Sequence, residues 1–127
     1  YAEQLGILEA VKFHGFSSEI HKIMAESAIY VSSSDYEGIS NSMLEALAIG
    51  IPAVCTDCPV GGARMYIRDG ENGYLIPVGD ADVMADRMLA LMEDKKLGES
   101  FSKESVKIRE ELTDDRIFGM WKALLVR

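Results

Sequence analysis

The chain has 127 residues, of which 48% are hydrophobic and 27% are charged, a balance that fits one globular domain with a modest core and excludes a disordered chain. The 13 Lys and Arg against 21 Asp and Glu give a formal charge of −8, so the surface repels both nucleic acid and an anionic bilayer. No apolar run is long enough to cross a membrane, and nothing resembles a secretory leader. We therefore expect a cytoplasmic protein whose anionic ligands are held by local features.

The hydrophobic pattern alternates between helical and extended segments along the chain. In chain order it predicts a last helical turn at 1–6, a strand at 10–15, a helix at 17–27, a strand at 28–34, a helix at 40–49 stopped by Gly50, a strand at 52–56, a Gly-rich loop at 58–73, a strand at 74–78, a helix from Asp80 or Asp82 to Met92, and helical structure at 96–127. Within the last segment one apolar face carries Ile117, Met120, Trp121, Leu124 and Leu125. Trp121 is expected to anchor the core.

This alternation predicts the α/β class, with a parallel sheet and helices on its faces. Ligands of such sheets bind outside the carboxyl ends of the strands, where helices present their N-termini. The loop "SSSDYEGIS", residues 32–40, lies at such an end. Gly38 permits a tight turn there, and Ser40 or Asn41 begins the next helix. The free amides of that helix start are expected to bind an anion.

Glu45 lies in the middle of the helix predicted at 40–49, a helix expected to be largely buried. No Lys or Arg lies three or four positions away to neutralise its carboxylate, which would seldom be buried unpaired. Glu45 is one turn after Asn41 on the same face, and helical side chains lean toward the N-terminus, so the carboxylate points at the anion site. There the carboxylate can accept hydrogen bonds from hydroxyl groups, such as those of a ribose. With Glu37 on the loop above, the pattern indicates a site for a sugar on a nucleotide diphosphate. The alternative is a carboxylate that the helix dipole favours.

Other candidate motifs indicate ordinary structure. Cys55 and Cys58 have redox-motif spacing but follow a strand, so we interpret them as one strand residue and one loop residue. His14 and His21 are isolated, and Asp35-x-Glu37 has no third carboxylate nearby in the sequence. No metal site is expected.

The stretch "SDYEGISNSMLEALAIGIPAV", residues 34–54, resembles the signature of the retaining glycosyltransferases of the GT-B fold, group 1 type, in which two Glu bracket seven residues. "VKFHGF", "GIPAVCTDCPVGG" and "RDGENGYLIPVGDADVMADRM" follow the order of that family's C-terminal donor-binding domain. The resemblance implies a Rossmann-like fold in which Glu37 acts at the donor sugar and Glu45 binds the ribose. It also implies that the amides of Gly38, Ile39, Ser40 and Asn41 hold the diphosphate. Gly15 and Phe16 are then expected near the base.

The resemblance covers only part of the family pattern. The family begins earlier, with two central strands, a Gly-rich turn, an Arg and a Lys, and an N-terminal acceptor domain. Residues 1–127 are therefore expected to be a partial C-terminal nucleotide-sugar-binding domain. A second departure is Met65, which stands where many relatives have Glu.

The activity that the resemblance implies is retaining transfer of a sugar from a nucleotide donor, UDP- or GDP-linked, to an acceptor hydroxyl. The resemblance also implies that no metal or cofactor takes part. The acceptor, a glycan or a lipid-linked sugar, would bind the other domain, in surface or capsular polysaccharide synthesis peripheral to the inner face of the membrane. The isolated chain is expected to be inactive and to self-associate through an unpaired strand edge.

Two other functions stay open from the sequence. One is a non-catalytic nucleotide-sugar-binding module or a GT-B epimerase, which would need further acid and base residues. The other is a signalling receiver domain. Against a receiver, no acidic pair follows the first strand and no Lys follows the last.

Overall fold

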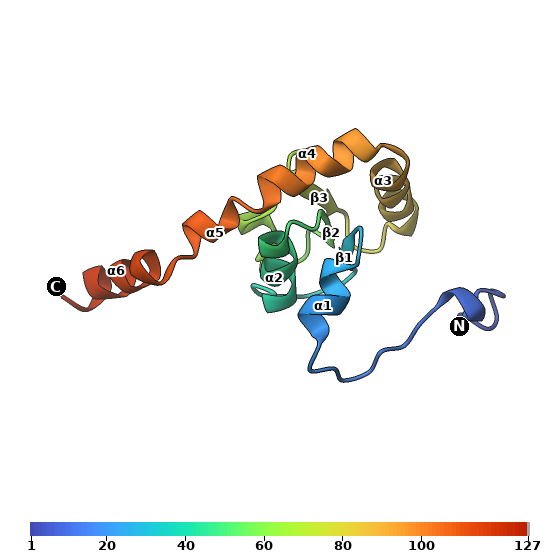
Figure 1. The fold of residues 1–127 in the computed structure, drawn as a ribbon, viewed down its shortest axis with the longest axis horizontal. Coiled ribbons are helices and arrows are strands. Elements are labelled where there is room, and N and C mark those ends of the chain that lie inside the picture. The colour runs from blue at the N-terminus through green and yellow to red at the C-terminus, as the bar shows by residue number, and fades with distance from the viewer. Residues whose placement is uncertain (127) are drawn as a thin grey trace.

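A computed structural model describes residues 1–126 of the chain. Its centre is a three-stranded sheet made of β1 (Tyr30–Ser32), β2 (Ala53–Thr56) and β3 (Gly73–Ile76), in that spatial order (Figure 1). Both strand pairs are parallel. The predicted α/β class with a parallel sheet is therefore confirmed.

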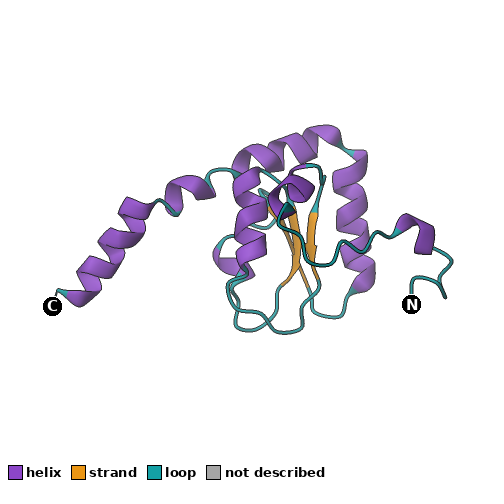
Figure 2. Cartoon of the chain, turned by 60° about the horizontal axis from the view of Figure 1, so that its bottom comes forward, coloured by secondary structure: helices purple, strands orange, loops and turns teal. Residues whose placement is uncertain are grey.

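Helices cover both faces of this sheet (Figure 2). The helices are α1 (Ile20–Ala25), α2 (Asn41–Ile49), α3 (Ala81–Glu93), α4 (Lys95–Ser105), α5 (Ile108–Glu111) and α6 (Asp114–Leu125), with short 3-10 turns η1 (Leu8–Ala10) and η2 (Ala63–Met65). Successive side chains of β2 point to opposite faces of the sheet. The strand therefore contributes to the helical layers on both faces. Ala53 and Cys55 pack toward α2, whereas Val54 packs toward α3 and α4. All four residues of β2 are buried, as its continuous apolar run predicts.

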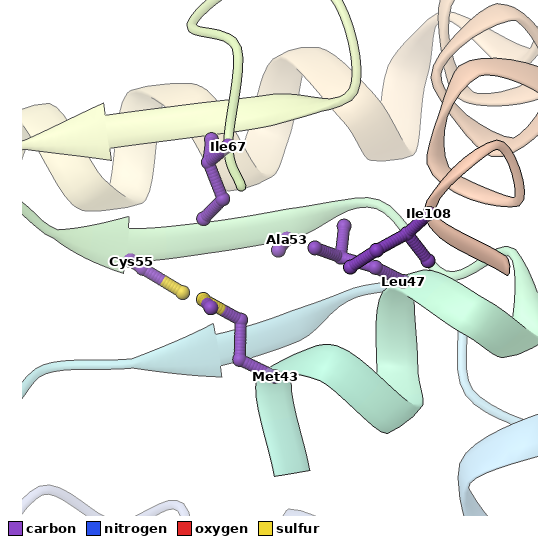
Figure 3. Packing of buried hydrophobic residues seen from close by; sticks show 6 residues of the cluster. All are labelled: Met43, Leu47, Ala53, Cys55, Ile67 and Ile108. Carbon is purple, nitrogen blue, oxygen red and sulfur yellow. The ribbon is translucent and has the colours of Figure 1, made fainter. Parts of the chain in front are cut away.

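The layer between β2 and α2 fixes where α2 begins. Met43, in the first turn of α2, and Cys55, near the end of β2, point toward one another (Figure 3). Leu47 and Ala53 continue this layer, and Ile108 of α5 closes it. The layer therefore anchors the start of α2 to the carboxyl end of the sheet.

The ends of α2 follow the sequence expectation. Ser40 is the N-cap, and its hydroxyl oxygen accepts a hydrogen bond from the amide of Met43 at 3.4 Å. Gly50 ends the helix with φ 98°, a left-handed conformation that glycine adopts without strain. Burial is less complete than expected, because only Met43, Ala46 and Leu47 of α2 are buried. Asp80, one of the two predicted caps, caps α3 through the amide of Val83.

The strand predicted at 10–15 is wrong. Residues 11–15 are exposed and pair with no strand among the described residues, and β1 stays an edge of the sheet. An apolar, extended segment becomes a strand only when a neighbour completes its hydrogen bonds, which its own sequence cannot reveal. The helix predicted at 17–27 forms only as the shorter α1. Self-association through the β1 edge stays a prediction.

The helical segment predicted at 96–127 is divided into α4, α5 and α6, and α6 extends away from the α/β body (Figure 1). None of its residues is buried, and the side chain of Trp121 is 60% exposed. The prediction that Trp121 anchors the core is therefore wrong for this chain. The apolar face of α6 forms as expected, but no described segment lies against it. Among residues 1–126, no helix combines the length and the apolar character that crossing a bilayer demands.

Candidate functional site

Two loops meet at the carboxyl end of the sheet and form one unit. The loop after β1, residues 33–40, is joined to the loop after β2 by two backbone hydrogen bonds at Glu37. The Glu37 amide donates to the carbonyl of Pro59 at 2.8 Å, and the Val60 amide donates to the carbonyl of Glu37 at 3.1 Å. The Thr56 hydroxyl also donates to the carbonyl of Ser34. The backbone of Glu37 is thus fixed from two sides while its side chain is exposed.

Gly62 makes this close approach possible. A Cβ atom built on Gly62 would lie 1.9 Å from the carbonyl oxygen of Gly38 and 2.7 Å from the amide nitrogen of Ile39. No side chain fits in that space. The second glycine of the Gly61-Gly62 pair is therefore required by contact with the loop that precedes α2.

The residues where these loops meet enclose very little space. A hollow of about 10 Å³ is lined by Ser32, Glu37, Gly38, Ser40, Met43, Cys55, Thr56, Cys58 and Ala63. Such a volume holds one water molecule at most. The space between the two loops is therefore too small for a ligand larger than water.

Those amides have unused hydrogen-bonding capacity. Within the described residues, the amide N–H groups of residues 38–42 have no backbone or side-chain acceptor. The first amides of this segment that donate are those of Met43, to the Ser40 hydroxyl, and of Leu44, to the Ser40 carbonyl. Free amides at the start of a helix, together with the helix dipole, favour a bound anion. The structure thus brings the predicted residues Gly38, Ile39, Ser40 and Asn41 together as one row of donors.

Glu45 lies apart from the hollow, on the side of α2 that faces α1. Its Oε2 atom is 3.4 Å from Nε2 of His21, and the Glu45 side chain is 44% exposed. The carboxylate that lacks a partner on its own helix therefore has one on α1. Sequence reasoning missed this contact because it treated His21 as isolated, and only the packing of α1 on α2 reveals it.

Gly15 and Phe16 do not line this site in the structure. Both precede α1 in an exposed segment, and the side chain of Phe16 is fully exposed. Ile39 and Asn41 are also exposed. The expected role of Gly15 and Phe16 near a base remains a prediction.

The two cysteines are structural. Both are free and buried, and burial above all raises the pKa of the Cys55 thiol to about 12. A thiol that stays protonated is a poor nucleophile, which agrees with the interpretation of Cys55 as a strand residue. Among the described residues, no group of three or more His, Cys, Asp or Glu side chains could hold a metal ion.

One cation lies beside the second loop. The side chain of Arg64, on η2, donates from Nε to Oδ1 of Asp57 at 2.7 Å. The hydrogen bond to this carboxylate raises the pKa of Arg64. The positive charge of Arg64 is thus already paired with Asp57. Next to it, a surface hollow of about 300 Å³ is lined by residues of the same loop.

A larger hollow lies at the other end of the sheet. It measures about 710 Å³ and includes Pro52 and Ala28, which precede β2 and β1, and Leu91 of α3. A smaller hollow of about 130 Å³ at the carboxyl end includes Ser33, Asp35 and Thr56. Because parallel sheets bind ligands at their carboxyl ends and the free amides lie there, we assign the candidate site to the loops rather than to this larger hollow.

The chain is similar to curated glycosyltransferases over most of its length. The chain is 36% identical over 128 residues to EpsD of Bacillus subtilis, whose glycosyltransferase assignment is itself provisional. The match covers 98% of this chain and 33% of EpsD. It is 33% identical over 112 residues to an N-acetylgalactosaminyltransferase of Campylobacter jejuni whose named substrate is a sugar linked to diphospho-undecaprenol. That match covers 88% of this chain and 30% of the enzyme.

Solved structures share the fold. A crystal structure of a TarM variant of S. aureus with UDP superposes with a TM-score of 0.90 at 30% identity, over 99% of this chain and 26% of TarM. HepE of Anabaena in complex with UDP gives a TM-score of 0.87 at 25% identity, over 98% of this chain and 34% of HepE. The chain thus spans about a third of the length of the curated relatives it matches. Its Rossmann-like architecture is that of the GT-B glycosyltransferases.

The family model described as glycosyl transferases group 1 matches residues 1–107, most of the chain. Both the paired loops and α2 lie inside this match. On these grounds the chain belongs to the group 1 glycosyltransferase family.

Proposed function

We propose that this chain is the donor-binding part of a glycosyltransferase that moves a sugar from a nucleotide-sugar to an acceptor hydroxyl with retention of configuration. The observation that carries the proposal is the row of free amides at residues 38–42, between Glu37 and Glu45. A row of amide donors suits the diphosphate, and the flanking carboxylates suit hydroxyl groups of the sugars on either side.

In this proposal the diphosphate of a UDP- or GDP-linked donor lies over the N-terminus of α2. The nucleotide extends toward α1, so that Glu45 accepts a hydrogen bond from a ribose hydroxyl. Gly15 and Phe16, which precede α1, are then proposed to approach the base. Family membership and the UDP complexes of the related TarM and HepE support the choice of a nucleotide-sugar.

Glu37 is proposed to act at the donor sugar. Its backbone is bound on both sides by Pro59 and Val60, so the exposed carboxylate extends from a fixed point. A group held before the substrate arrives loses little freedom when the transition state forms. Glu37 would therefore orient the sugar and stabilise charge near its reacting carbon. The diphosphate leaving group would be stabilised by the amides and the dipole of α2.

The acceptor is proposed to bind outside this chain, in a further domain of a longer protein. A glycan or a lipid-linked sugar in surface polysaccharide synthesis is the acceptor we favour, since the related Campylobacter jejuni enzyme is named for an undecaprenol-linked one. That acceptor class would place the protein in the cytoplasm, peripheral at the inner face of the membrane.

Amide chemical shifts test the donor site directly. The isotopically labelled chain would be titrated with UDP, with GDP and with uridine, which lacks phosphates. We expect the amides of residues 38–42 to shift most with a nucleoside diphosphate and much less with uridine. Shifts elsewhere, or none with either diphosphate, contradict the proposal. Retention would be tested separately, from the anomeric configuration of the product that a longer protein makes.

A further inference from the structure

The contact between His21 and Glu45 joins α1 and α2, two helices to which we assign different roles in the proposed site. His21 is the second residue of α1, the helix that follows Gly15 and Phe16, and Glu45 is in the middle of α2. Their Nε2 and Oε2 atoms are 3.4 Å apart. The contact therefore ties the segment expected near the base to the carboxylate expected at the ribose.

Apolar packing fixes the distance between the two helices. Met24 of α1 is buried against Ala46 of α2 and Ile51, with Ile49 beside them. Met24 lies three positions after His21, so both side chains are on the same face of α1. This packing directs the imidazole of His21 toward α2, so the contact with Glu45 follows from how α1 is seated.

The contact leaves half of the carboxylate free. Oε2 of Glu45 faces His21, whereas Oε1 has no hydrogen-bond or ion-pair partner among residues 1–126. The side chains of His21 and Glu45 are 68% and 44% exposed, so a ligand can reach them. One oxygen can thus hold the side chain in place while the other accepts a hydroxyl group.

We propose that His21 is a positioning residue that holds the Glu45 carboxylate in the orientation that accepts a ribose hydroxyl. The proposal rests on the proposed function, because it requires that Glu45 binds the nucleotide. A glutamate side chain has several rotatable bonds, and without His21 the carboxylate at this exposed position would sample other rotamers. Binding the nucleotide would then require that freedom to be lost again.

The test measures UDP binding by the 127-residue chain and by its variants. Binding is monitored through amide chemical shifts, because they detect weak binding. His21→Ala should weaken UDP binding by about threefold to tenfold, the cost of immobilising one flexible side chain. His21→Gln should restore most of the affinity, because its terminal amide nitrogen reaches nearly as far as Nε2 of histidine. Lys22→Ala is the matched control, since it removes a neighbouring cation from α1 that has no ion pair within residues 1–126.

A double-mutant cycle separates positioning from direct contact. In a Glu45→Ala background, His21→Ala should cause little further loss, because the carboxylate that it contacts is already gone. Losses that add fully would mean that His21 acts on UDP by itself, which overturns the positioning role. An unchanged affinity of His21→Ala, with its spectrum still that of a folded chain, overturns the role as well. If the unmodified chain does not bind UDP at all, the proposed function fails and this inference fails with it.

Discussion

Replacing Gly62 by Ala should separate the two loops that hold the candidate site. The new Cβ atom would lie 1.9 Å from the Gly38 carbonyl oxygen, far inside van der Waals contact, and both neighbours are backbone that cannot rotate away. The loop after β2 must therefore move. That movement breaks the two hydrogen bonds between Glu37 and the residues Pro59 and Val60. At a net value of about 0.5 to 1.5 kcal/mol for each bond, the free energy of unfolding should fall by about 1 to 3 kcal/mol.

The same movement should displace the free amides of residues 38–42, so UDP binding should weaken by about tenfold or more, equivalent to about 1.4 kcal/mol. Urea unfolding measures the first effect and chemical-shift titration the second. Gly98→Ala is the matched control. Gly98 lies within α4, and its new Cβ atom would meet only the Leu91 carbonyl oxygen, at 3.6 Å. Because alanine favours a helix over glycine, the free energy of unfolding should rise by about 0.5 to 1 kcal/mol. If Gly62→Ala binds UDP and unfolds like the unmodified chain, the contact between the loops does not position the site.

Three further predictions concern single side chains. Glu45→Ala should weaken nucleotide binding by about 1 to 3 kcal/mol in calorimetric titration, the scale of a hydrogen bond to a charged group, while the fold survives. Glu37→Gln, in a longer protein that carries this chain, should reduce turnover far more than donor affinity, and equal losses would place it at the nucleotide instead. The Cys55 thiol has its pKa raised by burial from 9.0 to about 12, so the unfolded chain loses this proton first as pH rises. From pH 8 to pH 10 the free energy of unfolding should therefore fall by about 1.4 kcal/mol more than in Cys55→Ala, and equal pH slopes would argue against a buried neutral thiol.

The α/β layers and the loop before α2 could be predicted from the sequence because they depend on local signals. The continuous apolar run of β2, the Ser40 cap and the Gly50 stop each act within a few residues, and each is found where the pattern puts it. The row of free amides follows from the same signals, since a helix that begins at Asn41 after a tight turn leaves its first amides without acceptors.

The errors lie where structure depends on distant partners. Residues 10–15 carry a strand-like pattern but have no neighbouring strand among the described residues. Trp121 lies on the apolar face that the sequence predicts, yet the described body does not cover it. His21 and Glu45 are 24 positions apart in the sequence, and only the seating of α1 on α2 brings them together. The hydrophobic periodicity of a single segment cannot predict contacts of this kind.

The chain as it stands should not transfer sugar. Its described residues supply donor-side groups, but Arg64 is occupied by Asp57, and no other Lys or Arg has an ion pair or hydrogen bond with the loops at residues 33–40 and 57–62. UDP should therefore bind weakly, because its diphosphate would be held by amides and a helix dipole without a cation. Holding both reactants in line can supply roughly 7 to 11 kcal/mol of a reaction barrier, and in our proposal the acceptor is held by a different domain. Mass spectrometry of UDP-glucose and UDP-N-acetylglucosamine incubated with the purified chain and simple acceptors should find no glycosylated product. Sustained transfer that disappears in Glu37→Gln would show that the chain holds an acceptor itself, and the division of labour proposed here would be wrong.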